Sequence, residues 1–431
     1  MNIALIVFVV SFILVFVLRI PIAAGMFMSS IFYFVLAKGP IADISMVATQ
    51  FLTSLNSSFV LIAVPLFVFM AEIMNSGKVT DMIFSFASAL VGRRRGGLGH
   101  VNVVASIIFS GMTGSALADA SGLGMMEIRA MKQHGYDDGF SCAITAASAT
   151  IGPVFPPSIP MIFYSMLSGA SVGALFMGGM LPGLLVGFAL MGYIAYIANK
   201  RNYSRGTKVA LREFSKITFK ATPALMSVVV LLGGIYSGIV TPTEAGALAS
   251  FYAIIISIFI YRAMSWSDFL QVIMATVRTT GILSLLVGSA YVFSYIVAIE
   301  HIPDAVANFL LNVTTNKYML LLLINLVFII LGMFVDTMTI ILVFIPIVLP
   351  LIEALGIDLV HFGVVITLNM MIGLSTPPFG MLLFVVSGIS DTSLKVVIKA
   401  ITPMLFVLFS VLFLITYVPP LVTFIPDFFG M

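Results

Sequence analysis

Charged residues are scarce in this chain. Asp, Glu, Lys and Arg make up 9% of its 431 residues, whereas hydrophobic residues make up 61%. Because soluble domains carry about a quarter charged residues, this balance excludes a soluble protein and predicts a polytopic membrane protein. The net charge of +3 is small, and we expect no nucleic acid as a partner.

Cysteine and histidine are also rare. The single cysteine, Cys142, excludes a disulfide framework. The four histidines show no metal-ligand spacing; they are His100, His134, His301 and His361. The chain has neither a Walker loop nor a GxGxxG motif, so energy from ATP would have to come from another chain. We therefore expect no enzyme activity and no organic cofactor.

Long apolar runs are abundant, and their lengths suit membrane spans. They lie near residues 3–18, 21–37, 58–75, 139–166, 172–198, 222–240, 246–261, 279–299, 360–386 and 397–417. Two further apolar regions, 100–128 and 319–352, are interrupted by SGMTGS and GMFVDT. Each half of these regions is too short to cross about 30 Å of hydrocarbon. We predict a re-entrant helical hairpin in each.

Basic residues set the expected orientation. Arg93, Arg94 and Arg95 precede the first hairpin, and Arg129 and Lys132 follow it. The positive-inside rule places both flanks in the cytoplasm, so this hairpin enters and leaves on one side. Counting the spans onward makes the second hairpin re-entrant from the outside and places both termini outside, which in a bacterial inner membrane is the periplasmic side.

The segment 199–221 between the two halves is strongly basic. Lys208, Arg212, Lys216 and Lys220 recur every four residues with apolar residues between them. This spacing predicts an amphipathic helix lying on the anionic inner leaflet of the lipid bilayer. A solvated linker is the alternative.

The chain repeats itself after 221 residues. Under this shift six pairs of glycine or proline coincide without a gap: Gly111 with Gly332, Gly135 with Gly356, Gly152 with Gly373, Pro156 with Pro377, Pro157 with Pro378, and Pro182 with Pro403. These residue types have the backbone roles that are hardest to replace. Together with the charge argument, the shift predicts two inverted repeats, each with a hairpin and a broken transmembrane helix, as in secondary transporters.

The paired prolines lie in segments that should be membrane helices. Unwound backbone in hydrocarbon leaves amides and carbonyls without partners, so it is tolerated where it is buried in protein or binds something. Half-helix ends can coordinate a cation or a carboxylate. Polar residues gather at the tips and breaks: Thr113, Ser115, Asp119, Ser148, Thr150, Ser158, Asp336, Thr337, Asn369, Ser375 and Thr376.

Asp336 is the strongest candidate ligand in this set. An ionised Asp near the bilayer centre costs about 2.5–3.5 kcal/mol, and a bound cation would offset that cost. Oxygen ligands without His or Cys favour Na⁺ over transition metals. For Asp119 a capping role is as good an explanation as ligation. For Ser148 and Thr150 hydrogen bonds to a helix backbone are an equal alternative.

Three motifs resemble a known family. FSGMTGSALADASGLG (109–124), ATIGPVFPPSIPMIFY (149–164) and IGLSTPPFGMLLF (372–384) are similar to the first hairpin tip and the two broken helices of the large membrane subunit of tripartite ATP-independent periplasmic (TRAP) transporters. The resemblance covers essentially the whole chain. It implies Na⁺-coupled import of an organic acid, of the sialic acid or C4-dicarboxylate class, across the bacterial inner membrane by an elevator motion.

The resemblance also implies partners and site residues. The partners are a periplasmic substrate-binding protein and a small four-helix membrane subunit, here a separate chain because this one begins directly with its first helix. At least two Na⁺ ions are implied. Their ligands would be Thr113, Ser115, Gly152, Phe155 and Pro157 for one, and Gly332, Asp336, Thr337, Ser375, Thr376 and Phe379 for the other. The substrate would lie between the tips, near Ser110, Asp119, Ser158, Asn369 and Pro378.

The expected organisation has five parts. They are scaffold helices with a first arm (1–95), the first half of a transport domain (96–198), the amphipathic linker (199–221), scaffold helices with a second arm (222–316), and the second half of the transport domain (317–431). A stand-alone Na⁺/anion symporter of the same design is the alternative function. A channel would need a charged ring or several subunits, and an enzyme would need a catalytic constellation near the tips.

Overall fold

The computed structural model describes residues 3–18, 20–37, 43–57, 59–75, 77–203, 205–206 and 209–430. Within these ranges the protein is built of helices, apart from one isolated bridge between Arg95 and Arg205. Seven helices are long and apolar enough to cross a membrane, and eight further apolar helices among the described residues are shorter. The all-α membrane fold predicted from composition is therefore confirmed.

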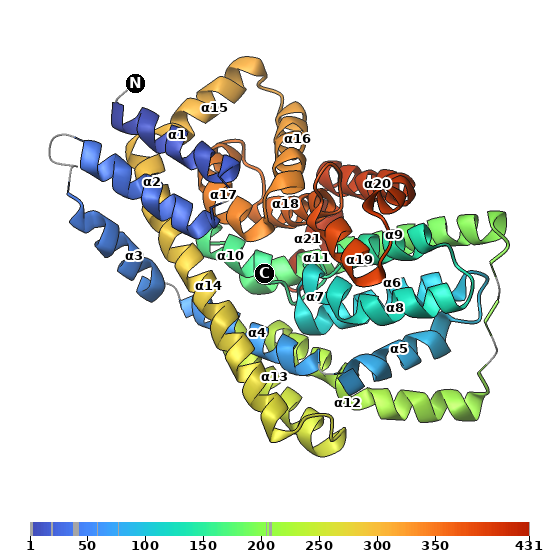
Figure 1. Ribbon diagram of the computed structural model, residues 1–431. Coiled ribbons are helices and arrows are strands. Elements are labelled where there is room, and N and C mark those ends of the chain that lie inside the picture. Colours follow the sequence, from blue (N-terminus) through green and yellow to red (C-terminus); the bar gives the residue numbers. More distant parts are fainter. Residues whose placement is uncertain are drawn as a thin grey trace.

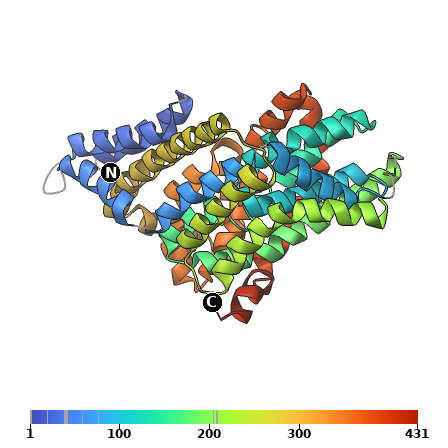
Figure 2. The same ribbon diagram turned by 90° about the horizontal axis from the view of Figure 1, so that it is seen from below.

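The first three helices, α1 to α3, lie together at one end of the molecule, where α14 packs against α2 and α3 (Figures 1 and 2). The N-terminal elements are α1 (Ile3–Val17), α2 (Ile22–Leu36), α3 (Ser45–Ser57), a short 3₁₀ turn η1 (Phe59–Ile62), α4 (Ala63–Met74) and α5 (Gly77–Val91). The middle of the chain forms α12 (Leu211–Tyr236), α13 (Pro242–Ile255), a π-helical turn η2 (Ile256–Ile260), α14 (Trp266–Ile299) and α15 (Ile302–Val313). Near the other end, α5 packs against α12 (Figure 1).

Two helical hairpins, each followed by a broken helix, form the rest of the molecule. The first set is α6 (Gly97–Thr113), α7 (Ala116–Ser121), α8 (Leu123–Gln133), α9 (Asp138–Ala149), α10 (Ile159–Ser168) and α11 (Val172–Lys200). The second set is α16 (Lys317–Phe334), α17 (Thr337–Ala354), α18 (Leu359–Leu374), α19 (Met381–Ser390), α20 (Leu394–Tyr417) and α21 (Pro420–Phe428). The helices α9 and α10 are separated by an unwound segment, as are α18 and α19.

The repeat is visible in the helix boundaries. The first arm of each hairpin ends at Thr113 and Phe334, and 334 − 113 is the predicted shift of 221. The last hairpin helices end at Gln133 and Ala354, again 221 apart. Both Pro-Pro bonds, 156–157 and 377–378, are cis and lie in the unwound segments. The opposite orientation of the two copies across the membrane stays a prediction.

The two sets interlock rather than stand side by side. Helix α9 packs against α19 and α20 of the other set, and α10 packs against α17 and α18. One continuous apolar core therefore joins the hairpins and broken helices, and the hairpin tips meet inside it.

The boundary expected near residue 221 is not a helix end. Helix α12 runs without interruption from Leu211 to Tyr236, with Pro223 inside it. The predicted basic helix is thus the first part of a longer one, on which Arg212, Lys216 and Lys220 are exposed. Lys208 lies outside the described residues. The helices α3, α5 and α15 were not among the predicted spans, because their 12 to 15 residues are fewer than the roughly 20 that a membrane span needs.

Candidate functional site

The first hairpin tip rests on the first broken helix. Gly114 ends α6 with a φ of 58°, and a Cβ at this position would lie 2.5 Å from the Pro157 carbonyl oxygen. From the other side, a Cβ on Gly152 would lie 3.4 Å from the Ala116 amide nitrogen. Ser115 begins α7, where its hydroxyl accepts a hydrogen bond of 3.3 Å from the Ala118 amide. Glycine is needed at Gly114 for both its φ and its close approach to backbone.

The second tip meets the second break in a similar way. The Gly380 amide donates to the Met333 carbonyl at 3.2 Å. Gly332 and Gly373 are so close that a Cβ on Gly373 would lie 2.7 Å from the Gly332 Cα. Asp336, the counterpart of Ser115, begins α17 and accepts hydrogen bonds from the Thr339 amide at 3.1 Å and the Thr339 hydroxyl at 2.6 Å. The shift of 221 predicts that Ser115 and Asp336 are equivalent, and the structure shows that each caps the helix that follows its tip.

A cavity of about 120 Å³ lies between the two tips. Its lining comes from both halves of the chain: Gly114, Ser115, Ala116, Leu117, Pro153, Ile159, Pro160, Asp336, Thr337, Met338, Met371, Leu374 and Met381. Three predicted site residues, Ser115, Asp336 and Thr337, are among them. The Thr337 hydroxyl is buried without a hydrogen-bond partner. The cavity thus combines one carboxylate and an unsatisfied hydroxyl with apolar walls, and no Lys or Arg lines it.

The remaining predicted residues lie around this cavity without lining it. Three hydroxyls are bonded within their own helices: Ser110 to the Ser106 carbonyl at 2.5 Å, Thr113 to Phe109 at 3.3 Å, and Thr376 to Ile372 at 2.6 Å. Gly152, Pro157 and Gly332 are buried, Phe155 is half-buried, and Pro378 and Phe379 are exposed. The Phe379 ring packs against Phe334 with centroids 5.3 Å apart.

Three other predicted residues hold the surrounding helices together. The Ser158 hydroxyl donates to the Pro153 carbonyl and caps α10 by accepting from the Met161 amide. The Ser375 hydroxyl donates to the Ala146 carbonyl at 3.3 Å and so connects the second break to α9. The Asn369 amide donates to the side chain and backbone oxygens of Asn325 at 2.7 and 2.9 Å, which joins α18 to α16.

Asp119 lies in a different place from the one expected of a substrate ligand. It is 1% exposed and does not line the cavity. Sequence reasoning did not single out the residues near it, Asn102 and Glu127, although polar residues in apolar runs are a signal of function in membranes. The periodic spacing of apolar residues could not identify Asn102 and Glu127, because it does not show which helices pack against each other.

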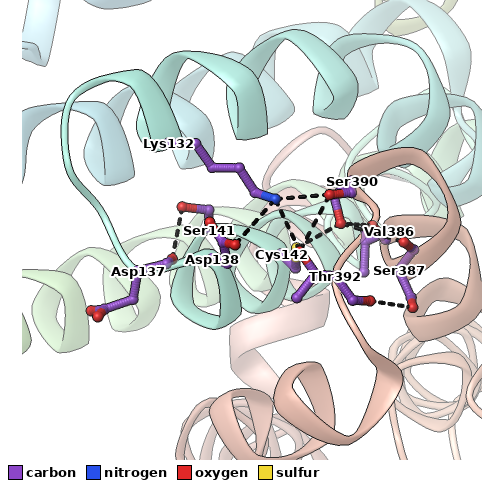
Figure 3. Close-up of polar contacts among 9 residues, drawn as sticks. All are labelled: Lys132, Asp137, Asp138, Ser141, Cys142, Val386, Ser387, Ser390 and Thr392. Carbon is purple, nitrogen blue, oxygen red and sulfur yellow. Dashed lines mark hydrogen bonds and ion pairs between the residues drawn. The ribbon is translucent and has the colours of Figure 1, made fainter.

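The end of the broken helix α19 is held by a lysine from the other half of the chain (Figure 3). Lys132, near the end of α8, donates to the Ser390 carbonyl at 2.8 Å and to the Thr392 hydroxyl at 3.0 Å. Its ammonium group also lies 3.5 Å from the Asp138 carboxylate. A cation stabilises the carbonyls at a helix C-terminus, so Lys132 binds the first hairpin to the second broken helix.

A second polar contact joins the residue before α9 to the residues that follow α11. Asp137 accepts hydrogen bonds from the Tyr203 hydroxyl and, at 2.5 Å, from the Arg201 guanidinium. The Tyr203 hydrogen bond is the main cause that lowers the pKa of Asp137. Burial, with the same hydrogen bond, raises the pKa of Tyr203 to about 12.

A family model matches almost the whole chain. The model of the "Tripartite ATP-independent periplasmic transporter, DctM component" matches residues 9–421. This chain belongs to that family. The resemblance seen in its tip and break motifs is therefore confirmed, and the chain is a transporter permease rather than an enzyme.

Three curated members of the DctM family are similar to this chain over most of its length. The sialic acid TRAP transporter large permease protein SiaM of Vibrio cholerae is 43% identical over 386 residues, 90% of each chain. The C4-dicarboxylate TRAP transporter large permease protein DctM of Pseudomonas aeruginosa is 36% identical over 87% of this chain and 88% of its own. The 2,3-diketo-L-gulonate TRAP transporter large permease protein YiaN of Escherichia coli is 34% identical over 88% and 89%.

A solved structure shares the fold. The YdaH transporter of Alcanivorax borkumensis superposes with a TM-score of 0.61 over 95% of this chain and 97% of its own, at 14% sequence identity. As a DctM-family permease with long apolar helices, the chain is a multi-pass protein of the inner membrane.

Proposed function

We propose that this chain imports an organic acid, coupled to Na⁺, through the cavity between its two hairpin tips. The observation that carries the proposal is the convergence of Asp336, Thr337 and Ser115 on that cavity. The half-buried carboxylate of Asp336 and the unsatisfied hydroxyl of Thr337 supply oxygen ligands of the kind that a hard cation such as Na⁺ prefers.

Two Na⁺ ions would lie at the two tips. The residues for the first are Thr113 and Ser115 with backbone of Gly152, Phe155 and Pro157. The residues for the second are Gly332, Asp336, Thr337, Ser375, Thr376 and Phe379. The close approach of Gly114 to the Pro157 carbonyl, and of Gly332 to Gly373, supports this assignment, because it brings backbone oxygens of the breaks next to the tips. A bound cation would offset the cost of unpaired backbone in the membrane.

The substrate would lie between the ions. The first residues of α10 and α17 line the cavity, and helix N-termini favour an anionic group. Because no Lys or Arg lines the cavity, these N-termini and the Na⁺ ions would hold the carboxylate of the substrate. Ser110, Ser158, Asn369 and Pro378 would contribute to the substrate site from around the cavity, whereas Asp119 lies apart from it. The relatives named for sialic acid and C4-dicarboxylates support these two substrate classes.

The family description supports a tripartite assembly. A periplasmic substrate-binding protein would deliver the acid, and a small four-helix membrane subunit would complete the permease. The hairpins and broken helices would move as a unit against α1–α5 and α12–α15, which is an elevator mechanism. Helix α12 contacts the moving part at Val228, which packs against Gly111.

Reconstitution tests this function. Labelled sialic acid and a labelled C4-dicarboxylate are offered to proteoliposomes that contain the chain and its small subunit. We expect uptake only with an inward Na⁺ gradient and with the binding protein present. Uptake that needs Na⁺ alone would identify a stand-alone Na⁺/anion symporter, and uptake without a Na⁺ gradient would contradict the coupling.

A further inference from the structure

Six polar side chains meet inside the first half of the molecule, apart from the cavity between the tips. They come from four helices and none exposes more than 2% of its surface. The members of this interior cluster are Asn102 and Ser106 of α6, Asp119 of α7, Glu127 of α8, and Thr145 and Ser148 of α9. None of them lines the cavity. The cluster contains two carboxyl groups.

The donor hydrogens of the cluster already have acceptors. The Asn102 amide donates to a Glu127 oxygen at 2.6 Å and to the Thr145 hydroxyl at 2.8 Å. The Ser148 hydroxyl donates to the Asn102 oxygen at 2.7 Å, and the Ser106 hydroxyl donates to Ser148 at 3.1 Å. Thr145 donates to a backbone carbonyl of its own helix. No donor hydrogen of these side chains is left for another acceptor.

Three carboxyl oxygens remain without a partner. They are both oxygens of Asp119 and the second oxygen of Glu127. Asp119 lies close to Thr145 of the cluster, because a Cβ on Gly124 would lie 2.5 Å from the Thr145 side chain and 3.4 Å from the Asp119 carbonyl oxygen. No Lys or Arg is buried anywhere in the described part of the chain. Carboxylates without a positively charged partner are unfavourable in a dry interior. The cluster therefore has hydrogen-bond acceptors in excess and lacks positive charge.

We propose that the interior cluster is a Na⁺ site, separate from the two at the tips. The ligands would be the carboxylates of Asp119 and Glu127 with the hydroxyl oxygens of Ser106 and Thr145. An oxygen-only set suits a hard cation. The few free oxygens fit Na⁺ better than Ca²⁺, which takes 6–8 ligands, or Mg²⁺, which keeps several waters. The ion balances one carboxylate, and the Asn102 amide stabilises the other.

The site joins three helices of the first hairpin to α9. An ion there would stabilise this half of the molecule whether or not substrate is present. The inference does not rest on Na⁺-coupled transport, because its readout is the stability of the purified protein. Its failure and the failure of the proposed function are therefore separate results.

The test measures melting temperature against NaCl concentration, with choline chloride keeping the ionic strength constant. The background is a Thr113→Ala, Asp336→Ala variant, which weakens both tip sites. We expect Na⁺ to raise its melting temperature, and Asp119→Asn to remove that rise. Because Asp119 has no hydrogen-bond partner, asparagine loses no protein contact there. Asp81→Asn, at an exposed acid on α5, is the matched control and should keep the rise.

A second variant keeps the proposal testable if Asp119→Asn fails to fold. Glu127→Gln should increase the Na⁺ concentration at half-maximal stabilisation by more than about tenfold, because the charge of one of the two carboxylate ligands is lost. An unchanged Na⁺ response in both variants would overturn the proposal. So would an equal response to KCl, or no Na⁺ response in the background variant.

Discussion

Alanine at Gly114 tests whether the first hairpin tip rests on the broken helix. The substitution has two effects. The φ of 58° costs an L-residue about 1–2 kcal/mol. The added Cβ would also lie 2.5 Å from the Pro157 carbonyl oxygen, where ordinary contact begins at 3.4 Å. The tip and the break must therefore separate by 3.4 − 2.5 = 0.9 Å, and overpacking of this kind costs about 1–3 kcal/mol more.

Gly169→Ala is the control that separates the steric contact with Pro157 from the backbone cost. Gly169 has a φ of 71°, but no atom lies within 4 Å of the place that an added Cβ would take, so alanine there meets only the backbone cost. We expect Gly114→Ala to lower the melting temperature of the purified protein more than Gly169→Ala does, and to lose uptake. Equal melting temperatures for the two variants would refute the contact between tip and break.

Two further predictions concern the surface of the hairpin region. Lys132→Met should destabilise the protein by about 2–4 kcal/mol, because it removes two hydrogen bonds from a charged group while the exposed Asp138 pair contributes little; an unchanged melting temperature would contradict the role of Lys132 at the end of α19. Asp137→Asn should lower the melting temperature at pH 7. Since the folded pKa of Asp137 lies below 3.8, its contribution is present above that pH and is lost as the pH falls through the folded pKa. The difference from the unchanged protein should therefore shrink as the pH is lowered below the ordinary range of an Asp carboxyl, and a constant difference would contradict this assignment.

The sequence was informative where backbone chemistry decides the structure. The spacing of glycines and prolines predicted the hairpins, the breaks and the equivalence of Ser115 and Asp336, because these residue types determine where a helix can end. The continuity of α12 could not be predicted in this way. The basic linker and the span expected from residue 222 join in one helix, which continues through Pro223.

The side-chain hydrogen bonds between helices could not be predicted from the sequence. Nothing in the spacing of Asn102, Glu127 and Ser148 shows that α6, α8 and α9 meet, because their contacts are decided by packing over 25 to 46 positions along the chain. The hydrogen bond from Ser375 to Ala146 joins the two halves of the chain across 229 sequence positions, and the sequence pattern could not predict it either. The repeat predicted which residues are equivalent, but not which of them touch.

The most direct test of Na⁺ coupling at the tips is the Na⁺ dependence of uptake by Asp336→Asn. Asparagine keeps the cap on α17, because its oxygen can still accept from the Thr339 amide, while the charge is lost. We predict that the Na⁺ concentration for half-maximal uptake rises more than about tenfold, as expected for a lost contact of about 1.4 kcal/mol or more. The melting temperature without Na⁺ should fall only slightly, because the bond from the Thr339 amide is kept and only the bond from the Thr339 hydroxyl is lost. Uptake with the Na⁺ dependence of the unmodified protein would contradict a Na⁺ site at Asp336.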